Sequence, residues 1–213
     1  MRHELQLQHG ALLLRPLAPG DATELAALVD PQLWSGMTSP LPGTPELMGQ
    51  FIEAATADPS RMPFAVVDLT GGSLLGSTSL YDLAPSQGRI GIGTTFYGRA
   101  SWGSRVNPTC KLLLLSHCFD ELDVNRVELR CDVRNTRSAN AIERLGATRE
   151  GTLRAHRIAA DGSVSDTATF SIIAAEWPQV RAGLLHRVEP SAVVVGPLST
   201  VNSAEHEVLP SLG

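Results

Sequence analysis

The chain is poor in several residue types, and each shortage excludes a class of protein. Its 213 residues include 3 cysteines, 5% aromatic residues and 18% charged residues. The 17 Lys and Arg residues are outnumbered by 22 Asp and Glu residues, which gives a formal net charge of −5. An overall negative charge creates no long-range attraction for nucleic acid or for an anionic membrane. We therefore expect neither as a partner.

Long apolar segments are also lacking. The longest apolar runs, 112–115 and 192–195, are far shorter than the roughly 20 residues that span a bilayer. No apolar segment typical of a secretory signal follows the first residues. The three cysteines (Cys110, Cys118 and Cys131) have no CxxC spacing, which is typical of buried free thiols in a reducing compartment. We expect a soluble cytoplasmic protein that needs no metal.

The residues that are present predict one mixed domain over 1–187, followed by a tail over 188–213. Alternating and apolar runs predict seven strands, at 11–16, 64–68, 74–81, 89–97, 126–133, 147–158 and 167–173. Capping residues and helical spacing predict helices at 21–29, 44–55, 107–122, 138–145 and 177–187. In this interpretation Pro31 ends the first helix and Asn107-Pro108 starts the third.

A glycine-containing loop at 98–108 joins a predicted strand to a predicted helix. Free backbone N–H groups and the positive end of the helix dipole meet at such a point, so it can bind an anion. Gly98 and Gly103 let the backbone approach a phosphate, and Arg99 and Arg105 add positive charge. The loop lacks the GxxxxGK[ST] pattern of a Walker loop. A plain connection between strand and helix is the simpler alternative.

A second polar segment covers residues 134–154. Its first part, R-N-T-R-S-A-N, places side chains that form hydrogen bonds at the end of one strand and in the first turn of the next helix. Asn135 or Thr136 acting as a plain helix cap would explain part of this pattern.

Together with these two segments, several motifs carry a resemblance to a known family. They are L-x-L-R-P-L at 12–17, I-G-I-G-T-T-F-Y at 90–97, W-G-S-R-V-N-P-T-C-K at 102–111, R-N-T-R-S-A-N-A-I-E-R-L-G-A at 134–147, E-G-T-L-R-A-H at 150–156 and F-S-I-I-A-A-E-W-P at 170–178. The chain resembles the GNAT N-acetyltransferase superfamily, in particular its RimJ/RimL-type branch, over residues 10–185. That implies an α/β fold: a mostly antiparallel sheet of about seven strands, two splayed parallel central strands and about four flanking helices.

The resemblance also implies acetyl-CoA as cosubstrate, bound between the strands at 89–97 and 126–133. Its pantetheine would pair with a free strand edge, and the loop at 98–106 would hold its pyrophosphate. The expected cofactor-binding residues are Phe96, Tyr97, Arg99, Trp102, Gly103, Ser104, Arg105, Val106, Asn135 and Ser138. The family's loop pattern, Q/R-x-x-G-x-G/A, keeps only its middle glycine here. Ala100 and Arg105 replace the outer residues, and Arg99 would supply the missing charge.

The implied reaction is direct attack of a primary amine on acetyl-CoA in a ternary complex. Backbone N–H groups near Phe96 or Tyr97 would stabilise the oxyanion. Many relatives place a general-acid tyrosine seven residues after the motif asparagine, but this chain has Ile142 there. Ser138 resembles the serine that faces the CoA sulfur in the RimJ/RimL-type branch. Local capping of the helix is its competing role.

Three side chains on the last strands are candidates for the general base. We take Glu150 as the catalytic residue, with Asp166 and His156 as the other options. Arg154 would lie on the same strand face as Glu150, as its partner in a structural ion pair or as an acceptor-site contact.

The acceptor is a protein N-terminus or a small-molecule amine. Segments 34–51 and 156–169 would shape its site, with Trp34, Met37 and Tyr81 as candidate wall residues. An alternative is an acyl-CoA-binding or scaffolding protein that has the fold without turnover. A weaker alternative is a partner-binding module that uses the apolar tail segment at 192–195. Exposed strand edges would also allow a homodimer.

Overall fold

One sheet of eight strands organises residues 3–189, the part of the chain that the computed structural model describes. The strands are β1 (Leu7–His9), β2 (Leu12–Pro16), β3 (Met62–Asp68), β4 (Ser73–Ala84), β5 (Arg89–Tyr97), β6 (Arg126–Asp132), β7 (Thr148–Ile158) and β8 (Val164–Ile173). Their order across the sheet is β1-β2-β3-β4-β5-β6-β8-β7. All neighbours pair antiparallel except β5 and β6, which are parallel.

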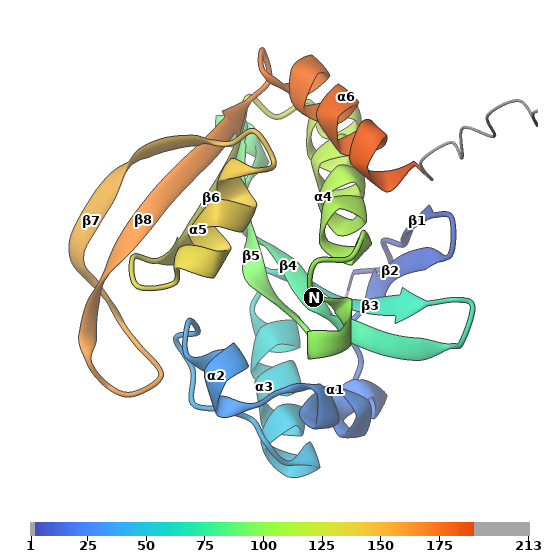
Figure 1. The fold of residues 1–213 in the computed structure, drawn as a ribbon, viewed down its shortest axis with the longest axis vertical. Coiled ribbons are helices and arrows are strands. Elements are labelled where there is room, and N and C mark those ends of the chain that lie inside the picture. The colour runs from blue at the N-terminus through green and yellow to red at the C-terminus, as the bar shows by residue number, and fades with distance from the viewer. Residues whose placement is uncertain (1–2, 190–213) are drawn as a thin grey trace, which may run out of the picture.

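Six α-helices cover the two faces of this sheet (Figure 1). They are α1 (Ala22–Leu28), α2 (Pro31–Trp34), α3 (Pro45–Ala57), α4 (Val106–Ser116), α5 (Thr136–Glu143) and α6 (Trp177–Val188). Buried side chains of α4, α5 and α6 share one apolar cluster with the sheet, and those of α1, α2 and α3 share the other. The sheet is thus buried on both faces near its centre.

The structure confirms the mixed fold and its parallel central pair but corrects the counts of about seven strands and four helices. The additional strand is β1, which pairs with β2 at the sheet edge. The first helix ends before Pro31, at Leu28, as predicted. Relative to the five helix ranges predicted from the sequence, the additional helix is the short α2. Pro31 starts this helix, and the Asp30 carboxylate caps it by accepting from Leu33 N at 2.9 Å. A proline is tolerated there because the first helical N–H has no partner within the helix.

The start of α4 also differs from the prediction. The helix begins at Val106 with Arg105 as its N-cap, so Asn107 lies inside the first turn and caps nothing. Pro108 fits there because the first four N–H groups of a helix make no bond within it. The predicted cap of α3 is confirmed, since Thr44 Oγ1 accepts from Leu47 N at 3.3 Å.

The core confirms the predicted state of the cysteines: Cys110, Cys118 and Cys131 are buried and free. None of the described helices combines the length and the apolar character that crossing a membrane requires. The predicted tail begins inside α6, which continues to Val188. Residues 190–213, with the apolar segment at 192–195, lie outside the described residues.

Candidate active site

The central feature of the site is the divergence of the two parallel strands. β5 and β6 pair only at Arg89 with Arg126, Ile90 with Val127, and Gly91 with Glu128. Beyond these pairs, residues 92–97 and 129–132 continue without pairing to each other. Backbone N–H and C=O groups at such an edge are strong donors and acceptors. An extended ligand that contains amides can pair with them as an additional strand would.

A backbone irregularity marks the middle of β5. Thr94 has a φ of +48°, and the register between β4 and β5 shifts between Ser77 and Ser79. This conformation is strained for a residue with a β-branched side chain. It turns the local N–H and C=O groups out of the ladder, which suits a donor for an oxyanion. Phe96 and Tyr97 follow with buried side chains, so only their backbone can serve the predicted role.

The loop after β5 has the features of an anion site at the start of α4. Gly103 has a φ of +71°, and a Cβ added there would meet no atom within 4 Å. Ser104 Oγ accepts from Val106 N at 3.2 Å, and the Arg105 side chain makes no cap bond. The remaining N–H groups of the first turn are therefore available to a phosphate, together with the positive end of the helix dipole. Gly98 has a different role, because a Cβ there would lie 2.9 Å from the Leu28 side chain.

Arg99 lies in the predicted loop but is directed to a protein carboxylate. Its Nε and Nη2 donate to Asp30 at 2.6 and 2.9 Å, and Nη2 also donates to Gln32. This pairing lowers the pKa of Asp30 to about 2. The expectation that Arg99 compensates for the missing basic residue is therefore not supported by its contacts. Its guanidinium fixes the loop to the start of α2.

Arg137 provides positive charge at this place, and the sequence analysis did not single it out. Its guanidinium lies 3.9 Å from the centre of the Trp102 ring, which Arg99 also approaches at 5.0 Å. Arg137 is the second residue of α5, so this contact joins the loop after β5 to α5 across the splayed strands. Among the described residues no carboxylate pairs with Arg137 or Arg105. Both guanidinium groups remain available to a phosphate.

Asn135 and Ser138 lie together at the start of α5. Asn135 is the N-cap, as the simpler alternative predicted, since its Oδ1 accepts from Ser138 N at 3.0 Å. The Ser138 hydroxyl does not cap the helix, which removes its competing role; it contacts the Cys131 thiol at the end of β6. Burial raises the pKa of that thiol. Ser138 thus places a hydroxyl where the splayed strands are farthest from their pairing.

Glu150 has surroundings that argue against its predicted role as base. It forms a two-pronged ion pair with Arg126 and accepts from Ser171 Oγ at 2.8 Å. These contacts lower its pKa to about 2, whereas a base works best with a pKa near the working pH. Arg126 starts β6, about 16 Å along the strand from Cys131 at ~3.3 Å per residue. Arg154, the predicted partner of Glu150, forms no ion pair within the described residues.

Of the other two candidate bases, His156 has the better position. Its Nδ1 lies 3.1 Å from Thr167 Oγ1, and Thr167 is the register partner of Asp132, next to Cys131. The imidazole is exposed. Asp166 instead accepts from Ala155 N at 2.8 Å, where β7 is irregular. Its carboxylate therefore stabilises the backbone of that irregularity.

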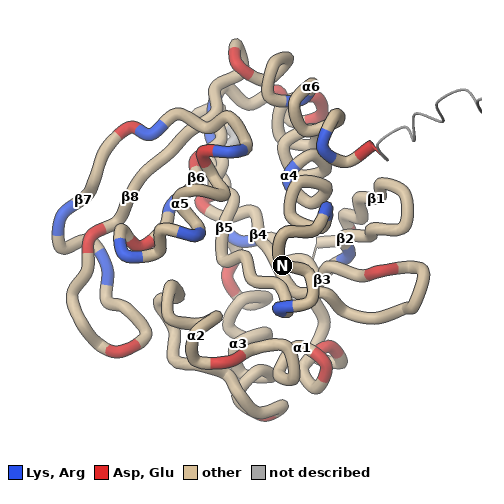
Figure 2. Tube along the Cα trace, in the orientation of Figure 1, with Lys and Arg blue, Asp and Glu red and all other residues tan. Residues whose placement is uncertain are grey.

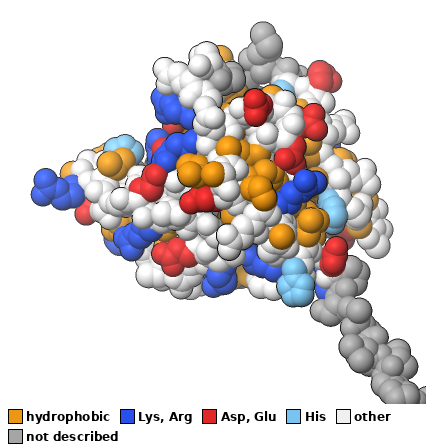
Figure 3. Space-filling view, turned by 90° about the horizontal axis from the view of Figure 1, so that it is seen from above, with side chains coloured by type: hydrophobic (Ala, Val, Ile, Leu, Met, Phe, Trp, Pro, Cys, Tyr) orange, Lys and Arg blue, Asp and Glu red, His pale blue; other side chains and the backbone are white. Residues whose placement is uncertain are grey.

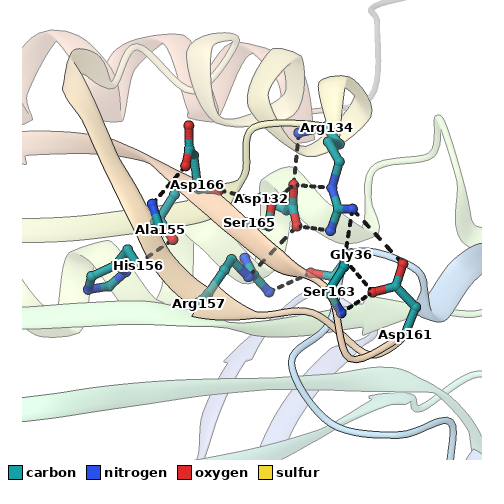
Figure 4. Close-up of polar contacts among 11 residues, drawn as sticks. Gly36, Asp132, Arg134, Ala155, His156, Arg157, Asp161, Ser163, Ser165 and Asp166 are labelled. Atoms are coloured by element: carbon teal, nitrogen blue, oxygen red, sulfur yellow. Dashed lines mark hydrogen bonds and ion pairs between the residues drawn. The ribbon is translucent and has the colours of Figure 1, made fainter.

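A buried carboxylate, Asp132, connects this region through Arg157 to Gly36 in the loop after α2 (Figure 4). Its side chain is 2% exposed and accepts from Arg134 at 2.8 and 3.0 Å and from Ser165 Oγ at 2.9 Å. The bond from Arg134 is the main cause of its low pKa, about 2. Arg157 Nε lies 3.9 Å from the same carboxylate, while its Nη2 donates to Gly36 O at 2.9 Å.

The loop after α2 is thereby held between two parts of the site. Ala160 N donates to Met37 O at 3.1 Å, so the β7–β8 hairpin binds this loop at two points. A Cβ added to Gly36 would lie 2.1 Å from Asn135 Nδ2. Gly36 therefore permits the close approach of the loop to the cap of α5. The predicted segments 34–51 and 156–169 do lie together here.

The candidate wall residues have different environments. Trp34 is 1% exposed and packs against Phe51 and Phe96, so it belongs to the core. Met37 packs at the edge of the same cluster. The Tyr81 ring covers Gly91 and Gly93 and lies under the Arg130 guanidinium. Its burial raises its pKa to about 12.

The β7–β8 hairpin projects from the body of the protein (Figure 3) and carries the basic residues Arg149, Arg154 and Arg157 along β7. Four large apolar side chains of β7 and β8 are exposed: Leu153, Ile158, Val164 and Ile173. Charged residues of both signs lie along β7 and on the neighbouring α5 (Figure 2). No group of three or more His, Cys, Asp or Glu side chains among residues 3–189 is arranged to hold a metal ion.

Comparison with known proteins places the chain among acetyltransferases. The family model described as Acetyltransferase (GNAT) domain matches residues 11–148. A Bacillus subtilis (strain 168) protein named "Putative ribosomal N-acetyltransferase YdaF" is 27% identical over 175 residues, 78% of this chain and 93% of that protein.

Two solved structures show the same architecture. A GCN5-related N-acetyltransferase from Brucella melitensis is 26% identical with a TM-score of 0.82, covering 88% of this chain and 87% of that one. Mycobacterium smegmatis RimJ in complex with CoA-disulfide has a TM-score of 0.72 at 19% identity, covering 85% and 92%. At that identity the likeness concerns the fold alone.

Proposed function

Because this chain belongs to the GNAT acetyltransferase family, we propose that it transfers the acetyl group of acetyl-CoA directly to a primary amine of a protein or peptide, within a ternary complex. The observation that carries the proposal is the loss of pairing between β5 and β6 after Gly91 and Glu128. It leaves a free strand edge that leads to an anion-binding loop, as an extended thioester ending in a pyrophosphate requires.

The cofactor side of the proposal uses mainly backbone groups. The edge of β5 from 92 to 97 binds the pantetheine, and the loop around Gly103 and Ser104 binds the pyrophosphate. Arg105 and Arg137 add charge, and Trp102 gives Arg137 an aromatic surface to stack on. In this assignment Arg137 takes the role that the sequence suggested for Arg99.

The chemical step uses two side chains near the end of β6: Ser138 contacts Cys131, and His156 contacts Thr167, the register partner of Asp132. Ser138 donates a hydrogen bond to the sulfur of CoA. His156 removes the proton of the acceptor amine, because its exposed ring is held by Thr167 and an imidazole nitrogen can act as a general base. His156 replaces Glu150 as the proposed base, since Glu150 is neutralised by Arg126.

The acceptor proposal rests on the β7–β8 hairpin. A projecting hairpin with exposed Leu153, Ile158 and Val164 and with basic side chains offers more contact than a small amine could use. The relative whose name includes a ribosomal N-acetyltransferase is in keeping with a protein acceptor. We also propose that residues 1–187 act as one domain and that the reaction takes place in the reducing cytoplasm.

The first test is a thermal-shift titration with acetyl-CoA, with dephospho-CoA and adenosine diphosphate as controls. A ligand at ~100 times its Kd adds about 2.7 kcal/mol to the free energy of unfolding, so the melting temperature should rise saturably. Acetylation of a panel of peptides with free N-termini and of small amines follows by mass spectrometry. Binding without acetylation of any amine would support the non-catalytic alternative, and no binding would refute the cofactor assignment.

A further inference from the structure

Lys111 is the single lysine of the chain, and it is buried. It lies on α4 with 4% of its surface exposed. Its Nζ donates to Thr95 Oγ1 at 3.2 Å. Within residues 3–189 no carboxylate forms an ion pair with it. A long charged side chain in such a place is rare unless it is paired.

The surroundings of Lys111 do not compensate its charge. The Cys110 thiol is the titratable neighbour that acts on it, and the Tyr97 hydroxyl lies beside that thiol. The β4 neighbour, Thr78, is uncharged. Burial therefore lowers the pKa of Lys111 to about 8, because a buried ammonium loses its hydration without gaining an anion. The side chain can release a proton far more easily than an exposed lysine.

Thr95 connects this buried amine to the splayed strands. It lies on β5 four residues beyond Gly91, where pairing to β6 ends, and directly after the irregular Thr94. Thr95 is half-buried, whereas Lys111 is buried. Thr95 Oγ1 also lies 2.8 Å from Thr78 Oγ1. The hydroxyl is thus held between the ammonium and Thr78 of β4, on the strand whose opposite edge is proposed to bind the pantetheine.

The reaction needs a proton at this place. The CoA thiolate leaves as a base, and the position that often holds a general-acid tyrosine is Ile142, a buried apolar residue. We propose that Lys111 supplies this proton through the Thr95 hydroxyl. The inference rests on the proposed acetyl transfer and adds to it a positioning residue and a relay.

The step is balanced in atoms and electrons. The lone pair of the acceptor nitrogen forms the N–C bond at the acetyl carbon, and the electron pair of the breaking C–S bond moves to sulfur. Sulfur takes the Thr95 hydroxyl proton while Thr95 takes one from the Lys111 ammonium. The acceptor nitrogen gives its own proton to the base. Lys111 then regains a proton from water after CoA leaves.

The test compares Lys111→Met and Lys111→Arg, and Thr95→Val with Thr95→Ser as its matched control. The first readout needs no acceptor: the ionisation of the thiol of bound CoA, followed by the ultraviolet absorbance of the thiolate. A neighbouring ammonium stabilises the thiolate. The thiol should therefore ionise at a lower pH in the wild type and Lys111→Arg than in Lys111→Met.

The second readout is the pH profile of kcat on an acetylated peptide. General-acid catalysis contributes about 10²-fold or more, so kcat should fall by that factor in Lys111→Met, Lys111→Arg and Thr95→Val. Thr95→Ser, which keeps the hydroxyl, should retain most of the wild-type kcat. In the wild type kcat should decline as the pH rises through the pKa of Lys111, and this decline should vanish in both Lys111 variants, because arginine keeps its proton.

The outcomes separate this inference from the proposed function. If CoA does not bind, both are refuted. If CoA binds and its thiol ionises alike in the wild type and Lys111→Met, the relay is refuted and acetyl transfer stands. The relay would also be refuted if Thr95→Val kept the kcat and the pH profile of the wild type. This variant leaves the buried lysine in place.

Discussion

The two sides of the splayed strands are built in opposite ways. The proposed cofactor side comes from a short stretch of chain, from the end of β5 to the start of α5, and uses mostly backbone groups. The acceptor side joins residues that are far apart, since the bond between Arg157 and Gly36 spans 121 positions. A site built from the backbone of one segment can therefore be recognised by a local sequence motif, whereas a site built from side chains far apart in the chain cannot.

The largest expected effect separates His156 from Glu150 on the acceptor side. His156→Gln should lower kcat by about 10²-fold, because it removes the proposed base. Glu150→Gln should leave kcat within about twofold, since its carboxylate is neutralised by Arg126. Steady-state kinetics with a saturating peptide decides between them. The reverse order of effects would restore Glu150 as the base.

A second prediction concerns Asp132, the buried carboxylate on the proposed acceptor side. Asp132→Asn should lower the free energy of unfolding by about 1–3 kcal/mol, because it leaves bonds of Arg134, Arg157 and Ser165 poorly satisfied. Urea denaturation measures this loss, and Asp161→Asn, on the exposed side of Arg134, is the control. Equal stabilities of the two variants would show that the buried network contributes little.

The same residue predicts a pH effect with a definite sign. The pKa of Asp132 in the folded protein is about 2, below its unfolded value of about 3.9. Its stabilising contribution is therefore present above pH ~4 and is lost as the pH falls towards 2. Stability measured across this range should decline more steeply in the wild type than in Asp132→Asn. Parallel curves would contradict the assignment.

On the cofactor side, the prediction contrasts two arginines that touch one tryptophan. Arg137→Met should raise the Kd for acetyl-CoA about tenfold, as expected for the loss of one charged contact, and the loss should shrink at high salt. Arg99→Met should change this Kd by less than about threefold, because Arg99 is paired with Asp30. Titration calorimetry at two salt concentrations measures both. A stronger effect of Arg99 would return it to the phosphate site.

The smallest expected effect concerns the serine near the sulfur. Ser138→Ala should lower kcat by about tenfold, the equivalent of one hydrogen bond of ~1.4 kcal/mol, and leave the Kd for acetyl-CoA unchanged. The helix start should be unaffected because Asn135 remains its cap. Circular dichroism checks this, and unchanged kcat would remove Ser138 from the chemical step.

Much of the fold was predictable because each element carries its own signal. Thr44-Pro45 marks the start of α3, and Asn135 marks the start of α5. The strand pattern with its one parallel pair followed from the family resemblance. Strand β1 was not predicted, because three residues with little burial give no periodic pattern. Helix α2 escaped because a proline that starts a helix also ends the preceding one.

The candidate site was predictable only in part. Gly103 and Asn135 belong to local sequence motifs and could be predicted from them. The pairing of Glu150 with Arg126 could not be foreseen, since it joins β7 to β6 across β8. Likewise, Arg99 and Arg137 look alike in sequence, and only a carboxylate 69 positions from Arg99 distinguishes them.

The burial of the one lysine has a chemical consequence for an enzyme that acylates amines. Free acetyl-CoA slowly modifies exposed lysine side chains of any protein that it meets. Within residues 3–189 this protein presents no exposed ε-amino group, since Lys111 is enclosed by α4 and the sheet. Its described surface is therefore inert towards its own reagent, and acetyl label recovered after turnover reports transfer to the acceptor with little background from the catalyst.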